Sequence, residues 1–417
     1  MNDCLDIPNI RHLRMVQMIG QLGGVTCASR TLNTSQPAVT QAISNLETEL
    51  GAELFERRAT GTYPTKVGRL FLRRIDRFFD ILEHAMAAVR GASERLAPPV
   101  ERLITATQIR ALIVTSEPST VNEVASQLGV SASTLYRSVR EMERHIGHRL
   151  FISTANGQVC NKTGEYLARR MRRAVREIEF ARGEVRSVTG TGNVKIVVGA
   201  LPMAGSCELA TAICALLAQR PEARVQILTR DYHSLLDDLE NCRIDMIFGL
   251  LRRPEWATDV EEEIFFRDSY CIAARRGHPL TKVPDITPEI LTQYDWVVPA
   301  AGTPRRKQID RLFEDIPRKP RFGIETSSLA TLRALLSKSD MITVMTRGEM
   351  TLDVSAGMLI SLPCRYLSPM PPKGLTTRSG WLPTEAHLDF IDCLRAATSP
   401  AMREKEQRGP AELAIAS

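Results

Sequence analysis

The sequence predicts an α/β protein in two parts, a pair of related and mostly helical units within residues 1–190 and a two-subdomain α/β region after them. Three observations support this prediction: the first part repeats itself, the second alternates strand and helix patterns, and the charge is unevenly distributed. Of the 417 residues, the first 190 hold 26 Lys and Arg against 19 Asp and Glu, whereas the remainder holds 28 against 29. A basic first part indicates a polyanionic partner.

An internal repeat with an offset of 96 residues relates the two helical units. When residues 28–74 are compared with 124–170, twelve positions are identical, whereas chance supplies about three. We name the units copy 1 (residues 1–92) and copy 2 (residues 93–190). The identical pairs include Leu32/Leu128, Ser35/Ser131, Glu47/Glu143, Gly51/Gly147, Leu54/Leu150, Phe55/Phe151, Gly61/Gly157, Lys66/Lys162 and Gly68/Gly164. The repeat therefore predicts two copies of one fold.

The pattern within copy 1 predicts a winged helix-turn-helix. A helix is expected to begin at Ser35, a favourable N-cap with Pro37 in the first turn, and its apolar residues recur at helical spacing as far as Leu50. A shorter helix and a polar turn precede it, a turn-rich wing follows, and a long helix begins near Thr65. The second helix of such a unit enters the DNA major groove. The candidate DNA-contacting residues of copy 1 are Ser35, Gln36, Pro37, Thr40, Gln41, Ser44, Arg57, Arg58 and Lys66.

The outward face of this second helix differs between the copies. Gln41 and Ser44 are uncharged, whereas their counterparts Arg137 and Arg140 are basic. Uncharged side chains hydrogen-bond to base edges, while an arginine row mostly neutralises phosphates and can also read guanine. Because the two wing arginines of copy 1 are absent from copy 2, two interpretations of copy 2 stay open, DNA contact or a role in packing and dimerisation; an ordinary solvated helix face is the alternative for either copy. The candidate DNA-contacting residues of copy 2 are Ser131, Ser133, Tyr136, Arg137, Arg140, Arg144 and Lys162.

Each copy ends in a long helix whose apolar residues recur at alternating steps of four and three, which is the pattern of a coiled-coil seam. Two-fold pairing between chains is expected of a protein that reads paired half-sites, and core packing inside one chain is the alternative. The seam consists of Phe71, Ile75, Phe78, Leu82, Ala85 and Val89 in copy 1 and of Leu167, Met171, Ala174, Ile178, Ala181 and Val185 in copy 2.

Copy 1 resembles the DNA-binding signature of the LysR-type transcriptional regulators through the run ASRTLNTSQPAVTQAISNLETELGAELFERR, followed by TKVG. Copy 2 keeps the spacing of this run but has Ala132 and Ser133 in place of Gln36 and Pro37. Since most members of that family carry one such unit, the tandem arrangement is a departure. The resemblance implies a regulator of transcription that binds duplex DNA and a small-molecule effector, acts as a homo-oligomer (dimer or tetramer) and has RNA polymerase as a further partner.

The resemblance extends to about residue 398 through segments such as VKIVVGALP and SYCIAARRGHPL. It implies a periplasmic-binding-protein-like (type 2) effector region over residues 191–398, in a subgroup that senses sugar acids or aromatic acids. Subdomain I is expected at about 191–270 and 372–398, subdomain II at about 271–371, and a disordered tail at 399–417.

The residues of this region independently predict a mostly parallel sheet, because β-branched runs alternate with helical patterns. In such folds ligands bind beyond the carboxyl ends of strands, at helix N-termini. Arg305 and Arg306 occupy the first turn of a helix expected to begin at Thr303, where the macrodipole disfavours cations. We hypothesise that a carboxylated effector relieves this conflict; pairing with nearby acids is the alternative. The candidate effector-binding residues are Leu201, Pro202, Met203, Thr229, Thr303, Arg305, Arg306, Thr326, Ser327 and Ser328.

Other functional classes are disfavoured. The sequence has no phosphate-binding Gly-rich loop, no G-x-S-x-G and no zinc-spaced His/Cys cluster, so we predict no enzymatic activity, no cofactor and no metal. Without a signal peptide or a membrane-length apolar run, a cytoplasmic protein is expected rather than a solute-binding or membrane protein. A redox-sensing regulator that uses effector-region cysteines stays an alternative, although Cys207 and Cys214 would lie roughly 10 Å apart on one helix, too far for a disulfide.

Overall fold

The computed structural model describes residues 6–58, 61–90, 104–117, 121–155, 157–190, 192, 195–201, 205–252 and 259–399. The chain forms two compact units, residues 1–194 and 195–417, and each is described by itself. The first unit contains both copies of the repeat. None of the described helices combines the length and the apolar content that a membrane span requires.

Copy 1 forms three short helices, a hairpin and one long helix. The hydroxyl of Ser35 accepts a hydrogen bond from the backbone N–H of Ala38 at 3.3 Å, and Gly51 ends the same helix in the left-handed region at φ 65°. Both ends of the predicted DNA-reading helix are therefore confirmed. The elements are α1 (Ile10–Leu22), α2 (Val25–Thr31), α3 (Gln36–Leu50), β1 (Phe55–Arg58), β2 (Gly61–Pro64) and α4 (Lys66–Arg90).

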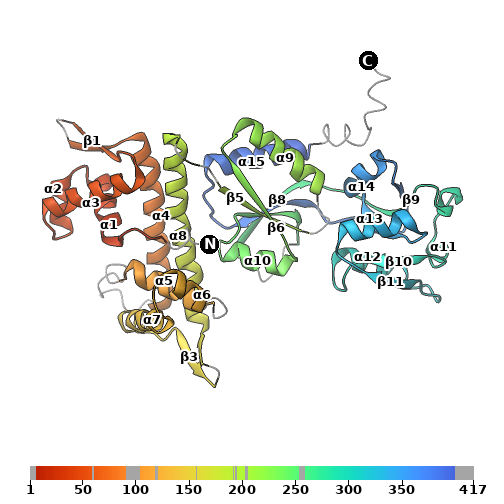
Figure 1. Ribbon diagram of the computed structural model, residues 1–417, viewed down its shortest axis with the longest axis horizontal. Helices are drawn as coiled ribbons and strands as arrows, with labels where there is room; N and C mark the ends of the chain where they lie inside the picture. The colour runs from red at the N-terminus through yellow and green to blue at the C-terminus, as the bar shows by residue number, and fades with distance from the viewer. Residues whose placement is uncertain are drawn as a thin grey trace, which may run out of the picture. The chain divides into compact units, whose positions relative to one another are not determined.

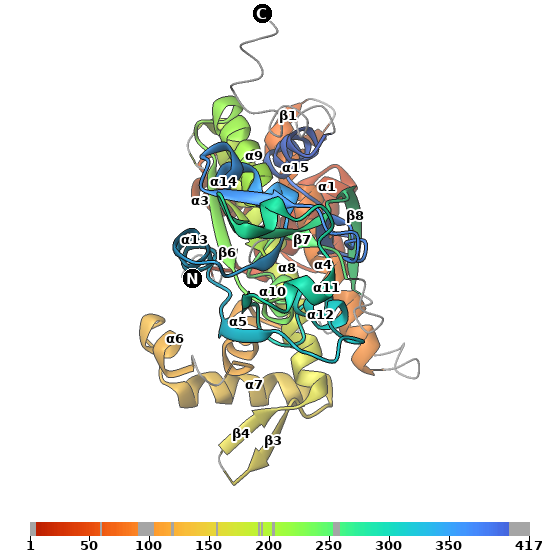
Figure 2. The ribbon, with the colours of Figure 1, turned by 90° about the vertical axis from the view of Figure 1, so that its right-hand side faces the viewer.

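Copy 2 repeats this order of elements. Ser131 accepts a hydrogen bond from the backbone N–H of Thr134 at 3.2 Å, and Gly147 ends the helix at φ 78°. The elements are α5 (Ala106–Thr115), α6 (Val121–Gln127), α7 (Ala132–Ile146), β3 (Phe151–Thr154), β4 (Gly157–Cys160) and α8 (Lys162–Thr189). Figure 2 shows the β3–β4 hairpin projecting beyond α7 as a wing. The winged helix-turn-helix prediction is thus confirmed for both copies, and α3 and α7 are the two recognition helices.

The long helices α4 and α8 pack side by side within the chain (Figure 1). They run antiparallel, because Arg74 near the start of α4 contacts Glu184 near the end of α8 at 2.7 Å. All the predicted seam residues from Phe71 to Ala85 and from Leu167 to Val185 are at most 1% exposed. The seam therefore joins the two copies of one chain, as the core-packing alternative expects.

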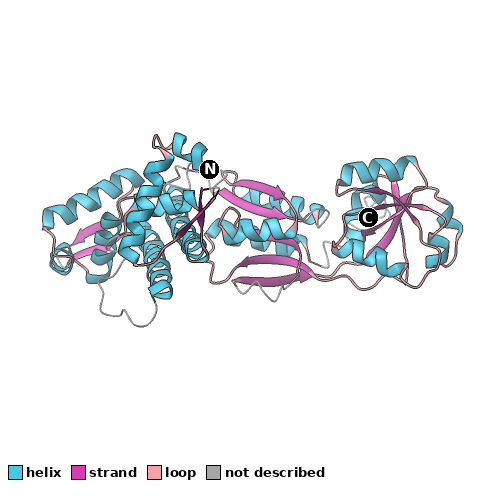
Figure 3. Cartoon of the chain, turned by 90° about the horizontal axis from the view of Figure 1, so that it is seen from below, coloured by secondary structure: helices cyan, strands magenta, loops and turns pink. Residues whose placement is uncertain are grey.

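The second unit begins with a five-stranded sheet in the order β6-β5-β7-β14-β8, where β5 runs parallel to β6 and β7, and β14 runs antiparallel to its two neighbours. The elements of this first subdomain are β5 (Lys195–Ala200), α9 (Ser206–Gln219), β6 (Arg224–Thr229), α10 (Tyr232–Glu240), β7 (Met246–Leu250), β8 (Val260–Phe266), β14 (Lys373–Arg378) and α15 (Glu385–Ala397). Figure 3 shows the strands of this unit flanked by helices.

The second subdomain lies between β8 and β14 in the chain. Its core holds the fully buried Trp296, which packs edge-on against Phe313 at 5.2 Å between ring centroids. The elements are β9 (Tyr270–Arg275), the 3-10 helix η5 (Pro279–Lys282), α11 (Pro288–Leu291), β10 (Asp295–Val298), α12 (Pro304–Leu312), β11 (Arg321–Glu325), α13 (Leu329–Lys338), β12 (Thr343–Thr346), α14 (Arg347–Ser355) and β13 (Leu359–Leu362).

The prediction of a mostly parallel sheet is wrong for this unit. Among its described residues, β10–β11, β5–β6 and β5–β7 pair in parallel, whereas β9 pairs antiparallel with β12 and β13, and β14 with β7 and β8. The reason is that the chain leaves the first subdomain after β8 and returns to it with β14. A β-branched run shows where a strand lies but not the direction of its neighbour. The predicted disordered tail lies outside the described residues from position 400 onward.

Candidate DNA interface and effector site

Residues that are identical in the two copies hold the recognition helix against the wing. The Glu47 carboxylate accepts hydrogen bonds from the backbone N–H groups of Leu54 and Phe55 at 2.7 and 3.2 Å. The equivalent Glu143 accepts the same two bonds in copy 2, at 2.6 and 3.1 Å. Each glutamate therefore satisfies the backbone at the start of its wing and fixes the angle between wing and recognition helix.

A glycine in the first turn of each long helix is the second shared feature. A Cβ atom at Gly68 would lie 1.9 Å from the carbonyl oxygen of Leu54, and one at Gly164 would lie 2.5 Å from that of Leu150. Both distances are shorter than any van der Waals contact, so no other residue fits without a shift of the backbone. The close approach brings the end of the wing, with Lys66 or Lys162, to the same place in each copy.

In copy 1 the structure places the predicted contact residues on an open and uncharged face of α3. Gln36, Pro37, Gln41 and Ser44 are exposed, and Thr40 is half-buried. The side-chain amide of Gln41 donates to Asn45 at 2.8 Å, which leaves its carbonyl oxygen available to a base edge.

Basic residues flank this face on the wing side. Arg57 and Arg58 are exposed on β1, and Lys66 is exposed at the start of α4. Arg58 forms an ion pair with Glu56 at 2.6 Å and lies 5.6 Å from the ring centroid of Tyr63. Exposed cations beside a recognition helix suit contacts to the phosphate backbone.

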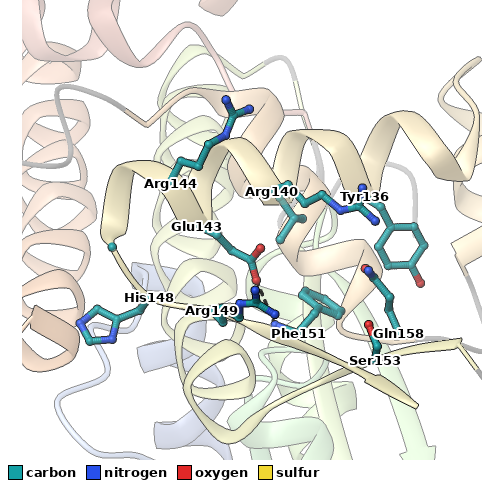
Figure 4. A pocket seen from close by; sticks show the side chains of 11 residues that line it. Tyr136, Arg140, Glu143, Arg144, His148, Arg149, Phe151, Ser153 and Gln158 are labelled. Carbon is teal, nitrogen blue, oxygen red and sulfur yellow. Dashed lines mark hydrogen bonds between the residues drawn. The ribbon is translucent and has the colours of Figure 1, made fainter. Parts of the chain in front are cut away.

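In copy 2 the recognition helix and the wing enclose a basic groove (Figure 4). Glu143 is the acidic group in its lining. Its carboxylate turns toward the wing, where it accepts the hydrogen bonds from the backbone N–H groups of Leu150 and Phe151. The ring of Tyr136 packs edge-on against Phe151, with 5.9 Å between centroids. A groove with several arginines and one engaged carboxylate attracts anions. Its lining comprises Tyr136, Val139, Arg140, Glu143, Arg144, Gly147, His148, Arg149, Phe151, Ser153 and Gln158.

The remaining candidates of copy 2 surround this groove. Ser133, Arg137 and Lys162 are exposed. The hydroxyl of Ser131, which caps α7, also lies 2.7 Å from the hydroxyl of Ser133. Copy 2 therefore presents an open basic surface where copy 1 presents an open neutral one.

Family models match both parts of the chain. The LysR substrate binding domain matches residues 191–399, and the model described as bacterial regulatory helix-turn-helix protein, lysR family, matches twice, at residues 10–69 and 106–165. The chain belongs to the LysR family of transcriptional regulators. The two helix-turn-helix matches confirm the tandem unit, and they place this LysR-type protein among regulators rather than enzymes.

Relatives differ in how much of this LysR-type chain they span. The HTH-type transcriptional regulator GalR of Pseudomonas putida is 29% identical over 392 residues, which are 94% of this chain and 98% of GalR, so the alignment includes both copies. The HTH-type transcriptional regulator PcaQ of Agrobacterium fabrum is 25% identical over 68% of this chain and 92% of its own. Among solved structures, a full-length OxyR variant from Pseudomonas aeruginosa covers 71% of this chain and 94% of its own, with a TM-score of 0.50 and 21% identity, which shows the fold alone.

In the effector unit, the structure gives Arg305 and Arg306 acidic partners. The guanidinium of Arg305 donates to both carboxylate oxygens of Glu349 at 2.6 Å, with the two side chains 11% and 1% exposed. Arg306 pairs with Asp310 at 2.9 Å and with Glu325 at 3.4 Å. The conflict with the helix dipole is therefore relieved within the chain, as the acid-pairing alternative expects, and these cations do not require a bound anion.

Several other predicted effector residues serve as helix caps. Thr303 accepts a hydrogen bond from the backbone N–H of Arg306 at 3.3 Å, and Ser328 accepts one from Thr331 at 3.2 Å. Thr326 accepts one from the backbone N–H of Ser328 at 3.1 Å. Of the rest, Leu201 is buried, Thr229 and Ser327 are exposed, and Pro202 and Met203 lie outside the described residues.

Sequence reasoning missed a cluster at the carboxyl ends of β6 and β7, which we name the tyrosine–arginine cluster (Tyr232, Arg252 and Tyr270). The guanidinium of Arg252 lies 4.6 Å from the ring centroid of Tyr232 and also interacts electrostatically with Tyr270. The same Tyr270 interacts with Arg305 and Glu349 of the second subdomain. The strand-end rule that indicated Thr229 applies equally to Arg252 after β7, but nothing in the sequence singles out Tyr270.

The tyrosine–arginine cluster is chemically unsatisfied. The hydroxyls of Tyr232 and Tyr270 are buried and have no hydrogen-bond partner among the described residues. Burial raises the pKa of Tyr232 to about 12 and raises that of Tyr270, so both remain protonated donors. Burial lowers the pKa of Arg252, yet a guanidinium keeps its charge, and this one forms no ion pair with a described residue. The cluster therefore offers two hydroxyl donors and one exposed guanidinium, and the carboxylates of Asp231 and Glu262 lie near it.

The cysteines give the redox alternative little support. Within the described segments no two cysteines form a disulfide, and Cys207 and Cys214 lie on the single helix α9, as predicted. Burial raises the pKa of Cys160 to about 12 and that of Cys271 to about 11. Since the thiolate is the form that oxidants attack, these buried thiols are poorly placed to act as sensors.

Proposed function

We propose that this LysR-type regulator reads base edges with α3 of copy 1 and contacts the phosphate backbone with α7 and the wing of copy 2. The observation that carries the proposal is the contrast between two open faces on the same scaffold, neutral at Gln41 and Ser44 and basic at Arg140 and Arg144. Amide and hydroxyl groups distinguish bases, whereas an arginine row supplies affinity that depends on salt. A packing role for copy 2 is the competing interpretation.

In vitro selection from a random duplex library tests this function with the full-length protein. We expect a defined sequence to be enriched, and Gln41→Ala to abolish or change that enrichment. Gln127→Ala, at an exposed glutamine that lies on α6 rather than on a recognition helix, is the matched control and is expected to enrich the wild-type sequence. A library that stays random with the wild-type protein would reject DNA reading by this chain.

We further propose that the effector is a carboxylated metabolite, such as a sugar acid or an aromatic acid, bound at the tyrosine–arginine cluster. Arg252 supplies the positive charge and the two buried hydroxyls supply hydrogen bonds, and these are the groups that a carboxylate accepts. Thr229 and Leu201 lie at ends of neighbouring strands, and Thr303, Arg305, Arg306, Thr326, Ser327 and Ser328 belong to the helix starts of the second subdomain. They remain proposed contacts to the rest of the ligand.

Calorimetry of the full-length protein with panels of sugar acids, aromatic acids and matched neutral compounds tests the effector class. Acids are expected to bind, and Arg252→Met to weaken their binding at least about tenfold. Arg365→Met is the matched control, because Arg365 is also an exposed arginine over a tyrosine, 5.1 Å from the Tyr366 centroid, but is paired with Asp285. Binding of neutral compounds alone would contradict the proposal.

The proposed partners complete this function. Effector binding changes the arrangement of the two subdomains and thereby the geometry of a homo-oligomer on DNA, with consequences for DNA bending and for RNA polymerase. The proposed place of action is the cytoplasm, because a regulator of this family must reach the chromosome.

A further inference from the structure

The contacts between copy 1 and copy 2 are exchanged in a two-fold manner. Near the end of α8, Arg182 forms an ion pair with Glu49 in the last turn of α3. Near the end of α4, Arg90 donates to the backbone carbonyl of His145 in the last turn of α7, at 3.2 Å. Glu49 and His145 are equivalent positions of the 96-residue repeat. Each long helix therefore ends against the recognition helix of the other copy, through arginines one helical turn apart in the repeat, which is an approximate two-fold contact inside one chain.

The faces that make this pair are fully occupied. The seam residues of both helices are buried by the chain itself, at most 1% exposed from Phe71 to Ala85 and from Leu167 to Val185. A pairing of the same helices between two chains would need these faces again. Helices α4 and α8 must therefore separate before a helix of a second chain can pack against either of them. That separation would expose a continuous apolar seam.

A buried ionic cluster fixes the register of the pair. Arg74 is 0% exposed and forms ion pairs with Glu177 at 2.8 Å and with Glu184 at 2.7 Å, both carboxylates being nearly buried. A one-turn slip of α4 along α8 would move the guanidinium away from one of these carboxylates and leave a charge buried without its partner. The two recognition helices are thus held at one separation and one relative orientation.

The length of the pair suits a duplex. A helix of 25 residues such as α4 spans about 37 Å, and the two copies lie toward opposite ends of the pair (Figure 1). Half-sites that a two-fold helix-turn-helix protein reads from one side of DNA are about 34–36 Å apart. The length of the long helices is therefore close to the length of one helical turn of DNA.

We propose that a single chain occupies two half-sites, about one turn apart, on the same duplex, with copy 1 in a base-specific half-site and copy 2 in a half-site read weakly through its phosphates. The inference rests on the proposed DNA-reading function and adds the stoichiometry and the asymmetry of the operator. The basic groove beside Arg140 and Arg144 supplies the second contact, because it lies on the part of copy 2 that corresponds to the reading face of copy 1. An oligomer of two chains then covers four half-sites.

The number of chains per half-site tests this proposal. The operator is obtained by selection with the full-length protein, its protected blocks are mapped by footprinting, and chains per duplex are counted by sedimentation at concentrations well above the Kd. We expect one chain for every two protected blocks, with one block strongly and the other weakly enriched in sequence. One chain per block would overturn the proposal while leaving DNA reading intact. Absence of any enriched duplex would instead reject the underlying function, and this inference with it.

Spacing variants of the same duplex test the rigidity of the pair. Inserting five base pairs between the two blocks turns one of them to the opposite side of the helix, so affinity is expected to fall at least about tenfold. A ten-base-pair insertion returns the block to the original side of the duplex but lengthens the separation by about one turn. Affinity is therefore expected to fall with this insertion as well. Unchanged affinity for both insertions would mean that the copies bind independently, which contradicts a fixed intrachain pair.

Discussion

Copy 1 and copy 2 carry the same elements in the same order, and the residues that they share have equivalent structural roles. Ser35 and Ser131 cap the recognition helices, and Glu47 and Glu143 hold the wings. The outward faces share almost nothing, neutral in copy 1 and basic in copy 2. The identical residues therefore include those whose side chains bind the backbone, whereas the residues on the open surface differ between the copies.

The long helices show a second contrast. Arg74 and Arg170 are equivalent in the repeat, yet Arg74 is fully buried in an ionic cluster whereas Arg170 is half-buried, 5.3 Å from the ring of Tyr166. The repeat equivalents of Glu177 and Glu184 in copy 1 are Ile81 and Ala88, so the symmetric counterpart of the cluster cannot form. The pair of helices α4 and α8 is two-fold in its backbone but asymmetric in its charges. The charges therefore distinguish copy 1 from copy 2.

The largest expected effect separates the two equivalent arginines. Arg74→Ala is expected to lower the free energy of unfolding by about 3–5 kcal/mol, because Glu177 and Glu184 lose their buried cation and keep only the partly exposed Arg77 and Arg73. Arg170→Ala is expected to cost less than about 1 kcal/mol, since the side chain is only half-buried. Chemical denaturation of both variants measures the difference, and equal losses would show that the pairing of α4 with α8 is not as described.

The two first-turn glycines come next. Gly68→Ala is expected to destabilise the protein by about 3 kcal/mol and Gly164→Ala by about 2 kcal/mol, since the added Cβ meets a backbone oxygen more closely at Gly68. Gly183 in α8 is the control, because a Cβ there meets nothing within 4 Å. Gly183→Ala is expected to stabilise the helix by about 0.5–1 kcal/mol. Thermal unfolding measures the stability of the three variants. A Gly68→Ala variant as stable as the wild-type protein would refute the close contact of wing and helix.

A smaller effect concerns sequence selectivity. Gln41→Ala is expected to reduce the preference for the selected duplex over a scrambled one by roughly 5-fold to 100-fold, because one base contact is lost. Arg137→Ala, at the equivalent position of copy 2, is expected to weaken both duplexes alike. Fluorescence anisotropy with both duplexes measures the ratio. If Arg137→Ala were the variant that lost selectivity, the assignment of the two faces would have to be reversed.

The smallest expected effect is on salt dependence. Arg140→Ser with Arg144→Thr gives copy 2 the residues of copy 1 at two exposed positions. The slope of log affinity against log salt concentration is expected to become shallower by about 2, since two phosphate contacts are removed. Ser44→Ala with Thr48→Ala, the matched pair in copy 1, is expected to leave the slope unchanged. An unaltered slope in the arginine variant would favour a packing role for copy 2.

Much of the first unit could be predicted from the sequence because its signals are local. Ser35 and Gly51 delimit α3, and the seam residues reveal the buried face of α4. An apolar seam, however, predicts which face of a helix is buried but not which helix covers it. The sequence alone therefore could not predict that α4 packs against α8 of the same chain. Likewise, the sequence offers Arg73 and Arg74 as identical neighbours, and only helix packing determines that Arg74 is the buried one.

The effector site was less predictable because its groups come from distant segments. Glu349 lies 44 residues after Arg305, so the partner that relieves the helix dipole was invisible to a local rule. Tyr232 begins α10, Arg252 follows β7 and Tyr270 begins β9, so the cluster draws on three segments that are far apart in the sequence. Strand direction was missed for the same reason, since β14 returns to the first sheet more than 100 positions after β8 begins.

Hydroxyl-radical footprinting on the selected duplex tests most directly that one chain carries two unequal readers. For each bound chain, the wild-type protein is expected to protect a pair of blocks about one helical turn apart. Arg137→Ala with Arg140→Ala is expected to shorten the protection to the single block of copy 1, and Gln41→Ala to lose the sequence preference of that block. Full-length protection by the double arginine variant, equal to that of the wild-type protein, would contradict the account.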